Sequence, residues 1–414
     1  MQIERPLYLD RLIKRRENGM AKVITGIRRC GKSYLLNVLY RDCLYSQGVD
    51  HDHVIDIALD DLRNTDLRDA IALLDHIEAL VTDKQTYYVF LDEIQYVENF
   101  SELINSLLHF DNLDVYVTGS NSRFLSSDIL TEFRGRGDEI RVRPLTFSEY
   151  HNALNNSLEE DWRDYATFGG MPQVVSMQES ELKSDYLQNL YRMVYLKDIS
   201  ERNSIRHSQV LESVVDVLAS SIGSLTSPKK IADTYTSTGT KGVTDKTVKK
   251  YIDFLEDAFL FEQAKRFDVK GRKYIGGNSK YYVEDVGVRN AMLNFRQQEE
   301  SHIMENVVYL ELKARGFSVD VGQTSVNEKL EGGWKRKNCE IDFIASKGSS
   351  KTYIQCAFAM PDADKRHQEE RPLVNVEDSF EKMIIVRDNI HAWRDDHGVL
   401  TIGLLEFLTD LQTI

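Results

Sequence analysis

The chain has 414 residues, of which 42% are hydrophobic and 29% are charged, and its formal net charge is −14. This length suits several domains, and so many apolar residues with only 6 prolines exclude a largely disordered chain. An acidic protein repels nucleic acid as a whole, so any contact with DNA would require a local basic patch.

The four cysteines are Cys30, Cys43, Cys339 and Cys356, and they have neither metal-site spacing nor the pattern of a disulfide framework. The first residues lack the apolar core of a signal peptide. No stretch approaches the roughly 18 apolar residues that a membrane helix needs. We therefore expect a cytoplasmic protein that makes no contact with a membrane.

Predicted strands and helices alternate in the first part of the chain, after a short basic helix at residues 4–17. Strands are predicted at residues 20–25, 54–59, 87–91, 115–118 and 140–142, and helices at residues 32–44 and 67–81. Such alternation predicts a parallel sheet with helices on both faces. We assign residues 1–150 to this α/β domain.

A glycine-rich loop joins the first predicted strand to the helix that follows it. It fits the P-loop pattern GxxxxGK[ST] at every position, with Gly26, Ile27, Arg28, Arg29, Cys30, Gly31, Lys32 and Ser33. The glycines let backbone N–H groups turn toward phosphate oxygens, and the helix N-terminus adds positive potential. We expect Lys32 to reach the β- and γ-phosphates of ATP and Ser33 to bind Mg²⁺.

Two acids, Asp92 and Glu93, follow the apolar run at residues 87–91. An acid at the carboxyl end of a parallel strand lies at the edge where open α/β sheets bind ligands. Asp92 is therefore expected to hold Mg²⁺, mostly through water, and Glu93 to orient the water that attacks ATP. The simpler alternative is a strand that ends in two acids by chance.

Two later segments would complete such a site. Residues 117–122 are predicted to form a polar sensor segment. Its strand would lie between the strand before the P-loop and the strand at residues 87–91, and Asn121 or Ser120 would contact the γ-phosphate. Arg136, or its neighbour Arg134, would stabilise the transition-state charge. An arginine acting on a neighbouring chain would require a homo-oligomer. The alternatives are a plain loop and a solvated arginine.

The rest of the chain is predicted to contain three further regions. Residues 151–225 form a helical lid or linker region, and residues 226–295 form a smaller, basic module. Strand signals return after residue 300, so residues 296–414 are predicted to be a second α/β domain. The predicted strands of that domain lie at residues 317–321, 339–345, 353–359 and 382–386.

The basic module stands out in an acidic chain, because residues 229–273 contain eleven Lys or Arg against seven Asp or Glu. A helix at residues 244–257 would carry several lysines on its polar face, and a basic turn follows at residues 270–273. This pattern is typical of a winged helix-turn-helix that contacts the phosphates of double-stranded DNA. The alternative is a helical module with an ordinary solvated face, which Glu256 and Asp257 favour.

Several runs of residues together resemble a known family. They are VITGIRRCGKS at 23–33, FLDEIQ at 90–95, TGSN at 118–121, PLTFSE at 144–149, YLKDI at 195–199, YYVEDVG at 281–287, ENVVYLEL at 305–312 and EIDF at 340–343. They resemble the prokaryotic AAA-type ATPases that carry a C-terminal domain of unknown function. The resemblance spans nearly the whole chain. It implies ATP binding, ATP hydrolysis and a restriction-endonuclease-like fold at the end.

Acids in the last domain are spaced as in the metal site of PD-(D/E)xK nucleases, with Glu305 on a helix and Asp342 on a strand. At the third motif, however, Gln355 stands for the acid and Ala357 for the lysine. We therefore expect this domain to bind or scaffold without cutting. Asp342 and its neighbour Glu340 would equally serve as structural partners of a nearby Arg or Lys.

The predicted fold class is thus α/β, with a P-loop AAA-type parallel-sheet domain, a helical and winged-helix middle region and a restriction-endonuclease-like domain. The predicted function is that of an ATP-binding and ATP-hydrolysing switch, which acts through its C-terminal modules on DNA or on a protein partner. Two alternatives stay open. One is an Mg²⁺-dependent nuclease gated by ATP, and the other is a regulatory adaptor that binds ATP without hydrolysing it.

Overall fold

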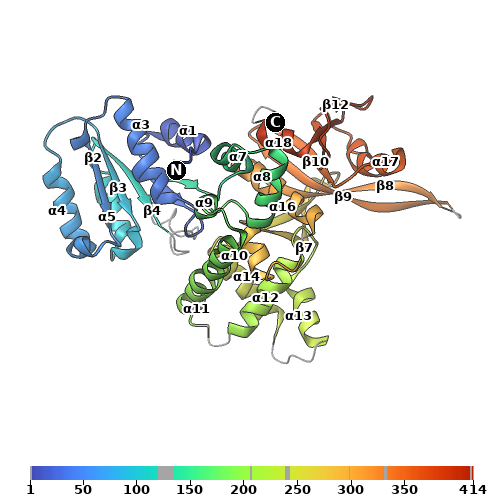
Figure 1. The fold of residues 1–414 in the computed structure, drawn as a ribbon, viewed down its shortest axis with the longest axis horizontal. Helices are drawn as coiled ribbons and strands as arrows, with labels where there is room; N and C mark the ends of the chain where they lie inside the picture. Colours follow the sequence, from blue (N-terminus) through green and yellow to red (C-terminus); the bar gives the residue numbers. More distant parts are fainter. Residues whose placement is uncertain are drawn as a thin grey trace. The chain divides into compact units, whose positions relative to one another are not determined.

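The chain folds into two compact units in a computed structural model, which describes residues 2–119, 135–205, 208–237, 243–297, 299–330, 333–410 and 413 (Figure 1). One unit comprises Met1–Pro144 with Asp257–Phe259, and the other comprises Leu145–Glu256 with Leu260–Ile414. Apart from Asp257–Phe259, the first unit ends at Pro144, and the predicted domain bound at residue 150 stays a prediction. The three later regions lie in one compact unit, and their separation into domains stays a prediction.

The first unit is built on a five-stranded sheet with the order β2-β3-β4-β1-β5. Its strands are β1 (Ala21–Thr25), β2 (Val54–Ala58), β3 (Tyr87–Asp92), β4 (Leu113–Thr118) and β5 (Gly137–Arg141). Every pairing in this sheet is parallel, as the alternating pattern predicted. Because β4 lies between β1 and β3, the carboxyl ends of these three strands meet at one edge.

Helices cover both faces of this sheet, which confirms the layered α/β prediction. The helical segments are α1 (Pro6–Arg15), α2 (Lys32–Tyr34), the π-helical η1 (Leu35–Tyr40), α3 (Arg41–Ser46), η2 (His51–His53), η3 (Leu62–Arg68), α4 (Ala70–Leu80), η4 (Ile94–Tyr96) and α5 (Phe100–Leu107). The segments α2, η1 and α3 follow one another without a break, so one long helix runs on from the predicted P-loop.

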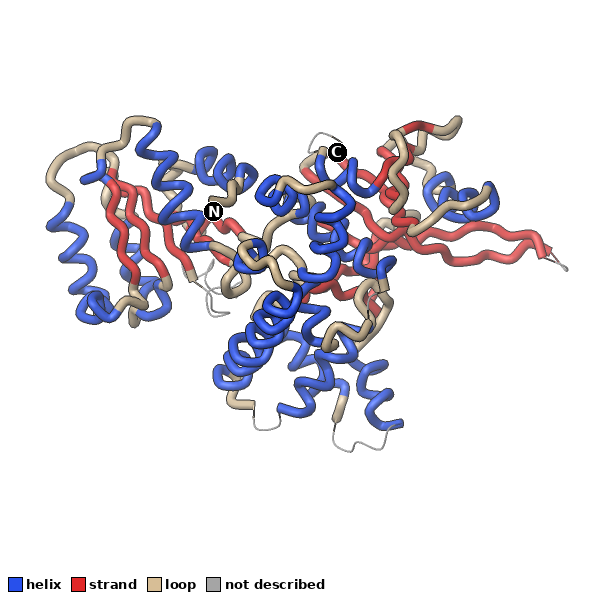
Figure 2. Tube along the Cα trace, viewed as in Figure 1, coloured by secondary structure: helices blue, strands red, loops and turns tan. Residues whose placement is uncertain are grey.

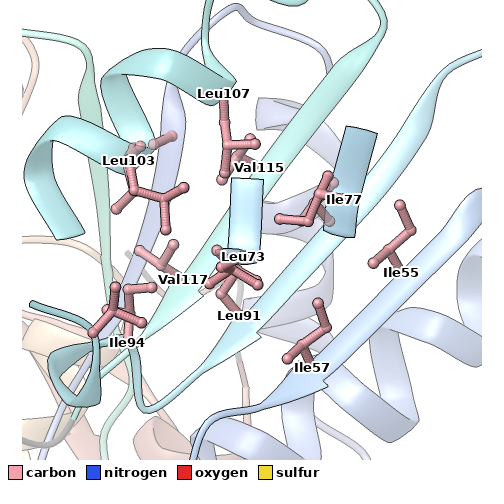
Figure 3. Packing of buried hydrophobic residues seen from close by; sticks show 14 of the residues in the cluster. Ile55, Ile57, Leu73, Ile77, Leu91, Ile94, Leu103, Leu107, Val115 and Val117 are labelled. Atoms are coloured by element: carbon pink, nitrogen blue, oxygen red, sulfur yellow. The ribbon is translucent and has the colours of Figure 1, made fainter. Parts of the chain in front are cut away.

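Apolar packing fixes one face of the sheet. Side chains of α4 and α5 pack against alternate residues of the strands, because successive side chains of a strand point to opposite faces (Figure 3). The cluster includes Ile55, Ile57, Leu73, Ile77, Leu91, Leu103, Leu107, Val115 and Val117. These contacts hold β3 and β4 in place, and both strands end at the candidate site.

A buried polar network fixes the opposite face. Lys22 of β1 forms a buried ion pair with Asp114 of β4. The hydroxyl of Tyr116 donates to the same carboxylate at 2.7 Å, and it bonds to the hydroxyl of Tyr40 at 2.7 Å. Charges in an interior are tolerated only when they are paired in this way. The network therefore joins β1 to β4, its neighbour in the sheet.

The second unit contains an eight-stranded mixed sheet with the order β12-β13-β11-β10-β9-β8-β6-β7. Its strands are β6 (Phe261–Asp268), β7 (Lys273–Val283), β8 (Ser318–Leu330), β9 (Gly333–Lys347), β10 (Ser350–Ala357), β11 (Glu381–Val386), β12 (Trp393–Arg394) and β13 (Leu400–Gly403). Figure 2 shows β8 and β9 running side by side as a long two-stranded ribbon. The hairpin β6–β7 pairs with β8, so it belongs to the same sheet as the C-terminal strands.

Helices surround this second sheet. They are α7 (Phe147–Leu154), α8 (Leu158–Phe168), α9 (Pro172–Val175), α10 (Ser180–Asn189), the π-helical η6 (Leu190–Leu196), α11 (Lys197–Arg202), α12 (Ser208–Ser220), α13 (Pro228–Ser237), α14 (Asp245–Asp257), α15 (Val286–Met292), α16 (Glu300–Ala314), α17 (Ala363–Val374) and α18 (Leu404–Thr409). Between residues 151 and 225 the described chain is mainly helical, as predicted.

The helix α14 has the predicted amphipathic character. The Thr244 hydroxyl accepts a hydrogen bond from the N–H of Thr247 at 3.2 Å and so caps the helix start. Val248, Ile252 and Leu255 point inward and are buried. The hairpin β6–β7 follows this helix, and a bridge between Thr226 and Ser279 joins the hairpin to the residues before α13.

A close backbone contact joins α8 and α15. Asp285 caps α15 by accepting from the N–H of Val288 at 2.9 Å, and it also accepts from the N–H of Gly170 at 2.7 Å. A Cβ atom at Gly287 would lie 1.9 Å from the carbonyl oxygen of Phe168. Only a glycine therefore lets the two segments approach each other this closely.

Substitution of Gly287 tests this contact. Gly287→Ala should lower the free energy of unfolding around α15 by about 1–3 kcal/mol, because the added methyl group overlaps a backbone carbonyl. Hydrogen–deuterium exchange of the α15 amides under increasing urea would measure the change. Gly276→Ala is the matched control, since a Cβ atom there meets open space. Equal exchange in the two variants would contradict the prediction.

Candidate functional site

The predicted P-loop follows the carboxyl end of β1 and leads directly into α2. Gly26 and Gly31 have φ values of 137° and 99°, which favour glycine, and Arg29 also has a left-handed φ of 65°. A Cβ atom at Gly26 would lie 2.0 Å from the carbonyl oxygen of Val142. The pattern of glycines is therefore required by the curled backbone of this loop.

Lys32 lies inside the curl of the loop. Its side chain is buried, with 5% of the residue exposed. The ammonium Nζ donates to the carbonyl oxygens of Gly26 at 2.9 Å and Ile27 at 3.2 Å. The loop therefore holds a positive charge among backbone groups that can reorganise around a phosphate.

The carboxylate of Asp92 joins three segments of the chain. The Ser33 hydroxyl, at the start of α2, donates to its Oδ1 atom at 3.0 Å. The hydroxyl of Thr118, at the end of β4, donates to the same oxygen. Ser33 and Asp92, both predicted to bind Mg²⁺, are thus in direct contact. Their oxygens are the hard ligands that this ion takes in proteins.

Burial raises the pKa of Asp92, although the hydrogen bonds from Thr118 and Ser33 act in the opposite direction. The negative charges of Glu93 and Asp60 raise the pKa further. The ionised carboxylate therefore gains from a cation beside it, which fits the predicted Mg²⁺ site. Protons will compete with that cation at a higher pH than they would at an ordinary aspartate.

Glu93 follows β3 in a left-handed conformation with a φ of 54°. Its backbone N–H donates to the Thr118 hydroxyl oxygen at 3.1 Å, and the side-chain amide of Gln95 donates to its carboxylate. A left-handed residue other than glycine costs about 1–2 kcal/mol, so the surrounding contacts must hold it in place. Thr118 therefore holds the Glu93 backbone, and Gln95 contacts its half-buried carboxylate.

Thr118 and Arg5 contribute to the site, and the sequence did not single out either of them. Arg5 is buried, with 3% exposed. Its guanidinium donates to the carbonyl oxygen of Cys30, within the loop, at 3.3 Å and to that of Arg143 at 2.8 Å. Thr118 lay within the predicted sensor segment at residues 117–122, but the γ-phosphate contact was assigned to Asn121 or Ser120, and Arg5 gave no signal beyond a basic helix start.

The remaining predicted residues do not join this cluster within the described chain. Asn121, Ser120 and Arg134 lie outside the described residues. Arg136 directly precedes β5, and its carbonyl oxygen accepts from the N–H of Ala21 at the start of β1 at 2.9 Å. The loop follows the other end of β1, which is 5 residues long, a span of about 17 Å. Arg136 thus lies at the opposite edge of the sheet from the P-loop of its own chain.

The C-terminal acids do come together. Glu305 of α16 and Asp342 of β9 both contact the ammonium of Lys280 on β7, as does Glu340. The side-chain oxygen of Gln355 accepts from the N–H of Asp342 at 3.4 Å. Among the described residues, no group of three or more His, Cys, Asp or Glu side chains is arranged to hold a metal ion.

The positive face of the basic module is partly neutralised. Lys249 pairs with Asp253 on the surface of α14. Lys270 contacts the carbonyl oxygen of Ser325 at 3.4 Å and lies 3.9 Å from the carboxylate of Glu377. Fewer lysines are therefore available for phosphate contacts than the count of charges suggested.

None of the helices within the described ranges is long and apolar enough to cross a membrane. This agrees with the sequence, in which no apolar stretch reaches that length.

Comparison with known proteins gives the following matches. Residues 18–151 match the family described as AAA domain, and residues 159–299 match a domain of unknown function, DUF8612. An uncharacterized protein of Haemophilus influenzae is 34% identical over 412 residues, which cover 98% of this chain and 98% of that protein. An uncharacterized protein of Methanocaldococcus jannaschii is 29% identical over 363 residues, which cover 84% of this chain and 76% of that protein.

Two solved structures give weaker matches. The Cdc6p protein of Pyrobaculum aerophilum is 12% identical with a TM-score of 0.28, and the match covers 73% of this chain and 94% of that protein. The ORC1 protein of Aeropyrum pernix, solved in complex with DNA, is 15% identical with a TM-score of 0.28. That match covers 70% of this chain and 92% of that protein. TM-scores this low do not establish a common fold.

The buried arginine beside the loop can be tested by its effect on stability. Arg5→Met should lower the free energy of unfolding of the first unit by about 1–3 kcal/mol, because it leaves buried carbonyl groups of Cys30 and Arg143 without their donor. Urea unfolding in nucleotide-free buffer would measure the loss. Arg63→Met is the control, since the Arg63 side chain is 87% exposed and its ion pair with Asp61 contributes little. Unchanged stability of Arg5→Met would refute this role.

Proposed function

This chain belongs to the same family as the Haemophilus influenzae protein, with an AAA domain followed by a domain of unknown function, and we propose that it binds ATP with Mg²⁺ and hydrolyses it. The observation that carries the proposal is the contact of Ser33 and Thr118 with one oxygen of Asp92. That contact supports a single site made from the P-loop, β3 and β4.

The proposed binding step uses the loop and its lysine. Backbone N–H groups of the curled loop would face the phosphates, and Lys32 would exchange its contacts with the Gly26 and Ile27 carbonyls for phosphate oxygens. Ser33 and Asp92 would hold Mg²⁺, with water completing its shell. When bound, this ion draws negative charge away from the β- and γ-phosphate oxygens.

The proposed hydrolytic step uses Glu93. A water molecule attacks the γ-phosphorus, its proton passes to the Glu93 carboxylate, and the bond to the β-phosphate oxygen breaks to release ADP and phosphate. The Gln95 amide donates to the Glu93 carboxylate, and the Thr118 hydroxyl accepts from the Glu93 backbone N–H, so both contacts would help to orient the proposed base. Contributions from Asn121 and Arg136 stay predictions. We propose that Arg136 acts on the site of a neighbouring copy, because it directly precedes β5 and lies at the edge of its own sheet opposite to the P-loop.

We further propose that the second unit binds double-stranded DNA or a protein partner, and that ATP hydrolysis in the first unit acts on that partner through this contact. The order of α12, α13, α14 and the hairpin β6–β7, with the bridge between Thr226 and Ser279, supports a winged-helix arrangement. The pairing of Lys249 and Lys270 with nearby acids argues for a weak, salt-sensitive DNA contact at most. The mixed sheet with its helices supports an α/β fold for the last domain, and the restriction-endonuclease-like form of that fold stays a proposal.

Removal of the loop lysine tests binding. Lys32→Ala should abolish tight binding of a fluorescent ATP analogue in Mg²⁺ buffer, because the ammonium that would face the phosphates is lost. Lys84→Ala, which removes an exposed lysine from the same unit, should bind like the wild type. Binding by Lys32→Ala at wild-type affinity would refute the proposed site.

Exchange of the second acid tests hydrolysis separately. Glu93→Gln should retain ATP binding but reduce phosphate release by about 10²–10⁴-fold, because the amide cannot accept the proton of the attacking water. Phosphate release should be measured with and without double-stranded DNA, since stimulation by DNA would link the two units. Glu98→Gln, an exposed neighbour, is the control. Wild-type turnover by Glu93→Gln would exclude its assigned role, and binding without turnover in the wild type would favour the regulatory adaptor.

A further inference from the structure

A single ammonium lies at the centre of the acid cluster in the second unit. Lys280 Nζ lies 2.9 Å from Glu305 Oε1, 2.8 Å from Glu340 Oε1 and 3.2 Å from Asp342 Oδ1. The lysine belongs to β7, Glu305 to α16, and the other two acids to β9. An ammonium group has three N–H donors, so each donor can serve one carboxylate.

Other groups of the chain also donate hydrogen bonds to two of these carboxylates. The Tyr282 hydroxyl donates to Glu305 Oε1 at 2.6 Å. The backbone N–H of Cys356 donates to the second oxygen of Asp342 at 2.9 Å. These bonds fix the two carboxylates with their oxygens turned toward the lysine. The arrangement is rigid because it is built on a helix and on strands of one sheet.

Burial makes the central charge necessary. The side chains of Lys280, Asp342 and Glu305 are only 3%, 11% and 14% exposed, whereas that of Glu340 is 35% exposed. Carboxylates that are removed from water are costly unless a cation compensates them. Burial alone would lower the pKa of Lys280, but the three acids outweigh it and hold this pKa well above its usual value. The lysine therefore stays charged.

We infer that the Lys280 ammonium occupies the cation position of a carboxylate cluster that would otherwise bind a divalent metal ion. Three acidic oxygens that converge on one point from a helix and a strand are the hard ligands that Mg²⁺ and Mn²⁺ take. Lys280 Nζ holds that point at hydrogen-bonding distance from all three oxygens. An ammonium and a metal ion cannot share it, so the lysine excludes the metal.

This inference is independent of the proposed ATPase activity and concerns the second unit alone. The altered third motif, with Gln355 and Ala357, had suggested only that a nuclease-like site was incomplete. The position of Lys280 adds a physical cause, because a cation supplied by the chain itself fills the site. It also gives the cluster a structural role, since the lysine ties β7 to α16 and β9.

Removal of the charge should therefore create a metal site. Lys280→Met keeps most of the side-chain volume but leaves three carboxylates without a cation. Titration of nucleotide-free protein with Mn²⁺, followed by electron paramagnetic resonance, should show one more bound Mn²⁺ per chain than in the wild type. Any ion held by Ser33 and Asp92 is common to both proteins and cancels in the comparison.

Three further variants make the result specific. Lys280→Met combined with Asp342→Asn should lose the additional ion, because a proposed ligand is gone. Lys273→Met, an exposed lysine on the same strand, should bind Mn²⁺ like the wild type. If Lys280→Met does not fold, Lys280→Met with Glu305→Gln restores the net charge of the cluster and keeps two carboxylate ligands. Circular dichroism would verify that each variant is folded.

Each outcome either supports or overturns the inference. A gained Mn²⁺ ion that depends on Asp342 supports the inference. A folded variant without Lys280 that gains no ion, in either background, would overturn it. The inference also fails if the wild type itself binds an Mn²⁺ ion that Asp342→Asn removes, since the lysine would then not exclude the metal.

Discussion

The candidate site depends on one carboxylate oxygen, Oδ1 of Asp92, which accepts hydrogen bonds from Ser33 and Thr118. Ser33 begins the helix after the P-loop, Asp92 ends β3 and Thr118 ends β4. This contact can form only because β4 is inserted between β1 and β3, so that three carboxyl ends meet at one edge. The buried ion pair of Lys22 and Asp114 joins two of these strands, β1 and β4.

Asp92 and the acid cluster around Lys280 are stabilised in different ways. In the first unit, hydroxyl groups are the hydrogen-bond donors to Asp92, and its pKa is raised by burial. Such a carboxylate gains when a cation arrives with a ligand. In the second unit, Lys280 supplies a cation from within the chain. The first arrangement suits reversible binding, and the second suits a fixed structure.

The sequence predicted what depends on neighbours along the chain. The P-loop, the acids after β3 and the alternation of strands and helices are local patterns, and all were found where they were expected. Arg5 and Lys280 were missed as members of their sites, because their partners lie far away in the sequence. Lys280 is 62 residues from Asp342, and nothing in the intervening residues marks the pair.

Arg136 directly precedes a parallel strand and so lies at the edge away from the P-loop of its own chain, and its role in hydrolysis stays a prediction. The hairpin β6–β7 of the basic module pairs with β8 of the last domain through residues such as Arg266 and Val321. A shortened protein that stops at residue 295 would lack β8, so the edge of β6 that pairs with β8 would be uncovered. An uncovered strand edge invites association with other chains. The basic module and the last domain should therefore be expressed and purified together.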